Sequence, residues 1–189
     1  LPNNYQSVEN ITALERGMSS NYTQAAVLSE ALASLYKEGD LRLDAYFKAV
    51  DKNGYRFSQK SGKDDFRCSF RVGEMYLNSA EAAAQSDKLP QARIRLLELM
   101  EKRYTPEAYA AKATAVNAMN KEALIQEILN ERARELAFEG HRWFDLRRTT
   151  RPRIEKVLKG GTYVLEQDDQ RYTIQIPREA IAANPELSN

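Results

Sequence analysis

The stretch Glu131–Arg148, ERARELAFEGHRWFDLRR, decides the fold because it places nine charged residues beside the only tryptophan and the only histidine. Its glutamates recur every four residues and share one helical face, where like charges repel. Arginines three residues away offset that repulsion in each case: Arg132 before Glu135, Arg134 after Glu131 and Arg142 after Glu139. Arginine suits planar, bidentate pairing in a partly desolvated place. The stretch therefore predicts a cross-linked structural corner at the end of a long helix.

The corner also holds the tryptophan, which we expect as a core anchor rather than as an exposed platform. Its members are Glu131, Arg132, Arg134, Glu135, Glu139, Arg142, Trp143 and Asp145. An alternative is an active site, because Glu131, Glu135 and Asp145 near His141 nominally supply the groups for acid and base catalysis. Each acid, however, has a matching arginine in the same segment, which holds it ionised. We therefore favour the structural interpretation and predict that the protein is not an enzyme.

The sequence gives no support for a metal site or a cofactor. Neither Glu-x-x-His nor His-Glu-x-x-His occurs, and a single histidine does not make a typical metal site. Cys68 is the one cysteine, so the chain has no internal disulfide and no cluster with zinc-ligand spacing. Because Phe66 and Phe70 flank it, we expect Cys68 to be a buried small hydrophobe.

Composition indicates a globular domain of 189 residues, with 42% hydrophobic and 29% charged residues. Lys plus Arg total 28 and Asp plus Glu total 27, and no long block carries one sign. A surface that binds nucleic acid needs such an excess of positive charge, so we exclude that partner. No apolar run approaches the roughly 20 residues of a membrane-spanning helix.

Apolar residues at three- and four-residue spacing predict four helices, over 24–37, 70–85, 90–103 and 121–139. Asn120 is the expected N-cap of the last, and Gly140 the left-handed residue that ends it. The second and third, alanine-rich and joined by a short turn, resemble a tetratricopeptide hairpin, although no full second copy at a period of about 34 residues is visible. Residues 104–119 are rich in alanine but lose the period, so we expect a loop.

Turn residues predict two short β-hairpins. The first spans 44–58 around an Asn53-Gly54 turn, and the second pairs 162–165 with 171–176. Residues 1–27 are polar and without a period, which indicates mostly loop, and Pro177 starts a short helical turn. The predicted fold class is therefore mainly α, with tetratricopeptide-like helical hairpins, loops and two short β-hairpins.

Four segments, in this order and spacing, resemble the C-terminal region of the SusD/RagB family, the starch-utilisation-type outer-membrane nutrient-binding lipoproteins of Bacteroidetes. They are LYKEGDLRLDAYF (35–47), FRVGEMYLNSAEAAAQ (70–85), NERARELAFEGHRWFDLRR (130–148) and IQIPREAIAANPELSN (174–189). The resemblance covers residues 28–189. We expect residues 1–189 to form the C-terminal domain of such a protein, without the N-terminal half and the lipid-carrying cysteine of the family.

The resemblance implies a non-catalytic protein of polysaccharide utilisation, anchored by lipid to the outer membrane at the cell surface. Family members bind glycans or other nutrients and present them to a TonB-dependent, SusC-like transporter. The shared motifs are scaffold, so none of their residues carries over as a ligand contact. A helical-repeat scaffold that holds a protein partner, without binding carbohydrate, is the alternative function, and polysaccharide, host glycan and peptide all stay open as ligands.

Sugar recognition needs flat aromatic faces for the apolar side of the ring and amide or carboxylate groups for its hydroxyls, presented on exposed loops. Two loops of this chain offer such residues. The candidate ligand-binding residues are Asn21 and Tyr22 in the first loop, and Asn53, Tyr55 and Phe57 in the predicted first hairpin, where Arg56 also lies.

Overall fold

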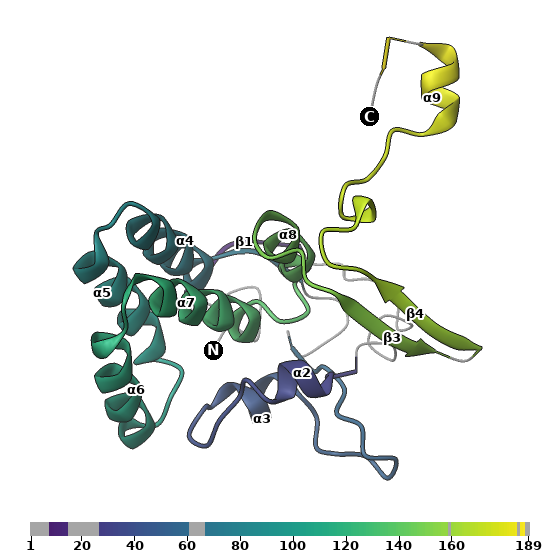
Figure 1. The fold of residues 1–189 in the computed structure, drawn as a ribbon. Coiled ribbons are helices and arrows are strands. Elements are labelled where there is room, and N and C mark those ends of the chain that lie inside the picture. Colours follow the sequence, from purple (N-terminus) through teal and green to yellow (C-terminus); the bar gives the residue numbers. More distant parts are fainter. Residues whose placement is uncertain (1–7, 15–26, 61–66, 159, 185, 188–189) are drawn as a thin grey trace. The chain divides into compact units, whose positions relative to one another are not determined.

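The computed structural model describes residues 8–14, 27–60, 67–158, 160–184 and 186–187 (Figure 1). The chain divides into two compact units, 1–141 and 142–189. The fold is mainly helical, with two antiparallel pairs of strands. The elements of the first unit are β1 (Asn10–Leu14), α2 (Glu30–Ala33), α3 (Arg42–Tyr46), β2 (Arg67–Arg71), α4 (Val72–Gln85), α5 (Leu89–Met100), α6 (Pro106–Ala118) and α7 (Lys121–Glu135). Next along the chain come α8 (His141–Arg148), β3 (Ile154–Leu158), β4 (Gly161–Leu165), the 3-10 helix η1 (Gln170–Tyr172) and α9 (Arg178–Ala183).

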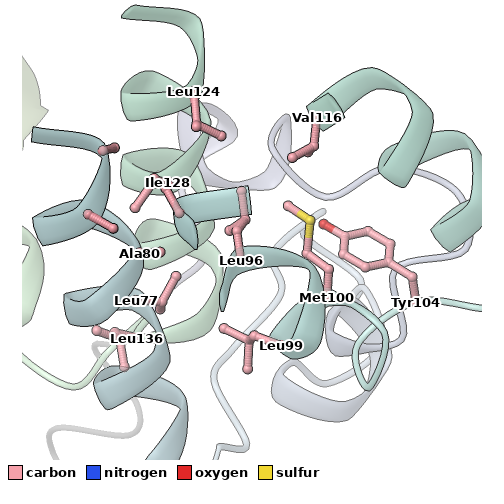
Figure 2. Packing of buried hydrophobic residues seen from close by; sticks show 13 residues of the cluster. Leu77, Ala80, Leu96, Leu99, Met100, Tyr104, Val116, Leu124, Ile128 and Leu136 are labelled. Carbon is pink, nitrogen blue, oxygen red and sulfur yellow. The ribbon is translucent and has the colours of Figure 1, made fainter. Parts of the chain in front are cut away.

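The core of the first unit lies where α4 packs against both α5 and α7. Alanines on the facing sides of α4 and α5 let the two helices approach closely, and Ala80 and Ala92 are completely buried. Figure 2 shows larger side chains filling the space around them, including Leu77, Leu96 and Ile128, none of which is exposed. Burial of each such aliphatic side chain stabilises the fold by roughly 1.5–3 kcal/mol.

A second pair of helices follows at the tetratricopeptide spacing. Helix α4 begins at Val72 and α6 begins at Pro106, 34 residues later, which is the length of that repeat. The expected loop over 104–119 is therefore wrong. Thr105 caps α6 by accepting a hydrogen bond from Ala108 N at 3.4 Å, and alanine favours helix without any packing. The helical period was invisible because Val116 is the one buried residue of α6.

The second hairpin forms with a different partner from the one that the sequence indicated. Strand β3 pairs with β4, so that Ile154 lies opposite Leu165 and Leu158 lies opposite Gly161. Gly160 and Gly161 have φ of +103° and +155°, which lets the chain reverse within the turn itself. Residues 171–176 form no strand; Arg171 and Tyr172 belong instead to the 3-10 helix η1, whose cap Asp169 accepts from Arg171 N at 2.8 Å.

Three further predictions differ from the structure in extent. The helix expected over 24–37 is described only from residue 27 onward and is helical over 30–33, where Ser29 accepts from Leu32 N. The first hairpin has its turn at Asn53-Gly54, but its arms are joined by isolated bridges, such as Phe47 with Ser58, instead of continuous strands. The expected loop of 1–27 contains β1, which pairs with β2.

Gly39 joins the start of the chain to the helical hairpins. Its carbonyl accepts from Thr105 N at 2.8 Å, and Leu41 N donates to Arg103 O at 2.9 Å. Gly39 has φ of +81°, and a Cβ at this position would lie 2.4 Å from Ala108 Cβ. Only glycine therefore both adopts this backbone conformation easily and leaves room for the close contact with α6.

We expect Gly39→Ala to lower the free energy of unfolding more than Gly54→Ala does. Gly54 has a similar φ of +84° but open space around it, so that variant bears the backbone strain alone, about 1–2 kcal/mol. Overlap with Ala108 adds about 1–3 kcal/mol in Gly39→Ala. Urea denaturation of both variants measures the difference, and equal losses would show that Gly39 does not touch α6 as described.

Candidate functional site

Glu135, the last residue of α7, is the centre of the charged corner. Its side chain has no exposed surface and binds three guanidinium groups. Oε1 lies 2.8 Å from Nη1 of Arg71, while Oε2 lies 2.9 Å from Nε of Arg103 and 3.1 Å from Nη1 of Arg42. These arginines come from the end of β2, the turn after α5 and the start of α3. One carboxylate thus ties three separate segments to α7.

Glu131, one turn earlier, is equally buried and shares a cation with Glu135. Its carboxylate lies 2.7 Å from Nη1 of Arg42 and 2.6 Å from Nη2 of Arg134. Asp40 binds the other edge of the Arg42 guanidinium, with Nε at 2.9 Å and Nη2 at 2.8 Å. This bidentate geometry is the strong form of an arginine–carboxylate pair. Arg42, which has no exposed surface, is therefore surrounded by acids.

Glu139 lies beyond the end of α7 and completes the corner. Arg71 binds its carboxylate with Nη2 at 2.8 Å and Nε at 3.0 Å, and Lys60 forms an ion pair with it. Lys60 also donates to the backbone carbonyls of Glu135 and Ala137. Helix ends leave such carbonyls without partners inside the helix, and cations complement the helix dipole there. Residues remote in sequence therefore cap α7.

The arginines keep the buried acids ionised. Burial by itself raises the pKa of Glu135, but Arg103, Arg71 and Arg42 outweigh it and hold that pKa well below its usual range. Burial likewise raises the pKa of Glu131, and Arg42 with Arg134 lowers it below the ordinary value. A general acid needs a proton to give near neutral pH, so these carboxylates are unsuited to that role. Their ion pairs join segments that are remote in sequence.

The partners differ in part from those that sequence spacing predicted. The pair of Glu131 with Arg134 is present, whereas the cations on Glu135 come from distant segments. Arg132 donates to Asn78 Oδ1 at 2.6 Å and lies 3.9 Å from Glu81. The cations that sequence reasoning missed are Lys60, Arg42, Arg71 and Arg103. A signal existed for two of them, because Arg42 and Arg71 lie in the motifs 35–47 and 70–85.

The remaining corner residues lie in the second unit. The Trp143 ring stacks on Tyr172, with centroids 5.1 Å apart and planes 10° apart, and Trp143 is 36% exposed. The expectation of a buried core anchor is therefore wrong in its degree of burial. Asp145 is buried and binds Arg148, with Nη2 at 2.7 Å from Oδ1. Burial lowers the pKa of Arg142, which the sequence paired with Glu139, and the charge of Asp145 opposes that shift.

The first hairpin presents two of the candidate ligand residues on one turn. Asp51 Oδ1 accepts from Asn53 N at 2.9 Å and from Tyr55 N at 2.8 Å, which fixes the turn. Asn53 is exposed, and 53% of Tyr55 is exposed. Phe57 is half-buried, and its backbone bridges to Val27. Asn21 and Tyr22 lie outside the described residues.

The described residues hold no group of three His, Cys, Asp or Glu arranged for a metal ion. His141 has one acid nearby, with Nδ1 at 3.8 Å from Glu74 Oε1. Within the same described part of the chain, no helix is both long and apolar enough to cross a membrane.

Fold and site together define a helical-repeat protein in which the described residues include a buried cluster of paired charges around Glu135. The chain belongs to the SusD family, whose model matches residues 45–189. A SusD-like carbohydrate binding protein from Bacteroides vulgatus has a similar fold, with a TM-score of 0.65 and 18% identity over 98% of this chain and 50% of that one. A SusD superfamily protein from Bacteroides fragilis also has a TM-score of 0.65, with 20% identity over 98% of this chain and 46% of that one. A SusD superfamily protein from Bacteroides thetaiotaomicron has a TM-score of 0.63 and 23% identity, over 86% of this chain and 40% of that one.

The chain thus spans about half the length of the solved structures that it matches. At these identities the likeness shows the fold. A comparison with the curated proteins found no significant match.

We expect Glu135→Gln to lower the free energy of unfolding by about 3–5 kcal/mol, because it leaves three buried guanidinium groups without their shared counter-charge. Glu98→Gln is the matched control, since Glu98 pairs with Arg95 where both side chains are more than 40% exposed. Such a surface pair contributes about 0–1 kcal/mol. Urea denaturation of both variants tests this, and similar losses would contradict the central role of Glu135.

The stability of the fold at acidic pH should depend on the same buried glutamates. The folded-state pKa values of Glu131, Glu135 and Glu139 are lowered, so their stabilising effect is complete above the unfolded value of about 4.3 and is lost as pH falls below it. We expect the urea midpoint of the natural protein to drop steeply below that pH. Glu135→Gln should show a shallower drop, and an unchanged slope would mean that Glu135 does not titrate with unfolding.

Proposed function

We propose that this protein is a non-catalytic, lipid-anchored component of the bacterial cell surface that binds glycan nutrients and delivers them to a SusC-like TonB-dependent transporter. The observation that carries this proposal is membership of the SusD family over residues 45–189. The fold supports it, because a structure with the same fold is a SusD-like carbohydrate binding protein. Delivery, anchoring and the outer-membrane location follow from the family resemblance.

The chemistry of the corner supports the proposal that the protein is not an enzyme. Hydrolysis of a glycosidic bond commonly uses two carboxyl groups, one of which must stay protonated. The lowered pKa values of Glu131 and Glu135 exclude them as that acid near neutral pH. Both side chains are also completely buried, so a sugar has no access to them.

The turn that carries Asn53 and Tyr55 is the proposed glycan contact in the first unit. The exposed Tyr55 ring offers a flat face to the C–H side of a pyranose, and the Asn53 amide offers a donor and an acceptor to its hydroxyls. Asp51 holds both backbone positions in place, so binding requires little ordering of the loop. Phe57 and the first-loop residues Asn21 and Tyr22 are further proposed contacts.

A second candidate function is the holding of a protein partner. The observation in its favour is the pair of helical hairpins at the 34-residue spacing, which is an architecture of protein interaction scaffolds. Binding experiments on the full-length protein separate the two functions. Tight capture of a protein ligand together with no binding on a broad glycan microarray would favour the scaffold.

We expect Tyr55→Ala to weaken binding of the best microarray glycan at least about five-fold, since loss of one aromatic stacking contact costs about 1 kcal/mol. Tyr163→Ala is the control, because Tyr163 is 58% exposed and Tyr55 is 53% exposed. Calorimetric titration of both variants of the full-length protein measures the effect. Equal affinities would remove the first hairpin from the binding site.

A further inference from the structure

The turn of the first hairpin places an amide side chain next to a backbone nitrogen that no side chain shields. Gly54 follows Asn53 directly, and a Cβ built on Gly54 would meet no atom within 4 Å outside the neighbouring residues. Its φ of +84° lies in the region that glycine adopts without strain. Nothing bulky therefore hinders the approach of the Gly54 nitrogen to the side-chain carbonyl carbon of Asn53, Cγ.

The arms of this hairpin are held together loosely. Isolated bridges join Phe47 with Ser58 and Val27 with Phe57, and no continuous strand runs through residues 47–58. Segments with few such hydrogen bonds open locally at a low free-energy cost, while the rest of the fold stays intact. The turn can therefore leave its folded conformation without unfolding of the unit.

Asp51 opposes that opening. Its Oδ1 accepts from Asn53 N at 2.9 Å and from Tyr55 N at 2.8 Å, and its backbone carbonyl accepts from Gly54 N at 3.0 Å. Aspartate commonly fixes turns in this way, through its own side chain. Because the Gly54 nitrogen is engaged with Asp51 O, it reaches Asn53 Cγ only after these hydrogen bonds break. Asp51 thus controls how often the two atoms can meet.

We propose that Asn53 is a site of spontaneous deamidation and that Asp51 sets its rate. The Gly54 nitrogen bonds to Asn53 Cγ and gives its proton to water, while the bond from Cγ to Nδ2 breaks and ammonia leaves. The resulting five-membered succinimide is opened by water, at Cγ to give aspartate or at the main-chain carbonyl to give isoaspartate. One ammonia is released and one water is consumed, so the change needs no enzyme and no redox partner.

The modification alters the proposed glycan contact. Both products replace a neutral amide by a carboxylate, and Asn53 Nδ2 lies 3.4 Å from Asp51 Oδ2, so the new charge lies close to a like charge. Isoaspartate also adds one carbon to the main chain within the turn, which the hydrogen bond of Asp51 N to Tyr55 O at 2.9 Å does not accommodate. Tyr55 is therefore displaced and the amide donor is lost. This consequence for binding, unlike the modification itself, rests on the proposed function.

The test is ageing of the full-length protein at mildly alkaline pH, followed by peptide mapping by mass spectrometry. Labelling with an isoaspartate methyltransferase identifies the isoaspartate product. We expect isoaspartate and aspartate to accumulate at Asn53. Asn78, which also precedes a small residue, is the internal control and should stay unchanged, because it lies within α4 and accepts from Arg132 Nη1 at 2.6 Å.

Variants test the role of Asp51. We expect Asp51→Ala to speed the modification at least about five-fold, since loss of a hydrogen bond shifts an opening equilibrium by about that factor. Asp51→Asn retains an acceptor oxygen and should give an intermediate rate. Asp44→Ala is the matched control, because it removes a carboxylate that pairs with Arg56 in the same hairpin but does not bind the turn. Thermal melts confirm that each variant folds.

Calorimetric titration before and after ageing measures the effect on binding. Affinity for the best microarray glycan should fall several-fold as Asn53 is modified, whereas Asn53→Gln, whose longer side chain closes the ring poorly, should keep its own starting affinity.

An aged protein with Asn53 intact would overturn the proposal, as would equal rates in Asp51→Ala and Asp44→Ala. Unchanged affinity of the modified protein would overturn the consequence for binding. Binding of no glycan before ageing would instead remove the proposed function and leave the modification standing.

Discussion

The first unit depends on one buried carboxylate shared among three guanidinium groups. Glu135 draws Arg42, Arg71 and Arg103 to the end of α7, and each arginine belongs to a different segment. Desolvating so many charges is costly, and similar buried networks contribute little net stability compared with apolar packing. Their consequence lies in specificity, because any arrangement that misplaces one segment leaves a charge buried without a partner. The apolar core drives collapse, while the corner selects the arrangement.

This difference between the apolar core and the charged corner explains which parts of the fold could be predicted from the sequence. The apolar faces of α4, α5 and α7 are periodic, and Asn120 caps α7 as predicted, with its Oδ1 2.9 Å from Ala123 N. Helix α6 was missed because its alanines bury almost nothing. Its residues favour a helix, but they show no periodic pattern of apolar side chains. The second hairpin was misassigned because Gly160-Gly161 was taken as a lead-in, whereas Gly160 lies in the turn and Gly161 begins β4.

Only part of the candidate site could be predicted from the sequence, and the reason is physical. Local spacing finds pairs on one helix, such as Glu131 with Arg134, but most cations of the corner are brought in by tertiary contacts. Gly73 illustrates the coupling, because a Cβ there would lie 3.0 Å from Glu135 Oε1. A glycine in one motif thus makes room for a glutamate in another. Ligand contacts on loops have no such mutual constraint, so the sequence offered residue types and little more.

The most direct test of this account is a double-mutant cycle between Glu135 and Arg103 in the full-length protein, combining Glu135→Gln with Arg103→Gln. We predict a coupling free energy of about 1–3 kcal/mol in unfolding, with glycan affinity of the folded variants unchanged. Additive effects on unfolding, or variants that unfold normally yet no longer bind glycan, would contradict the claim that this corner is structural.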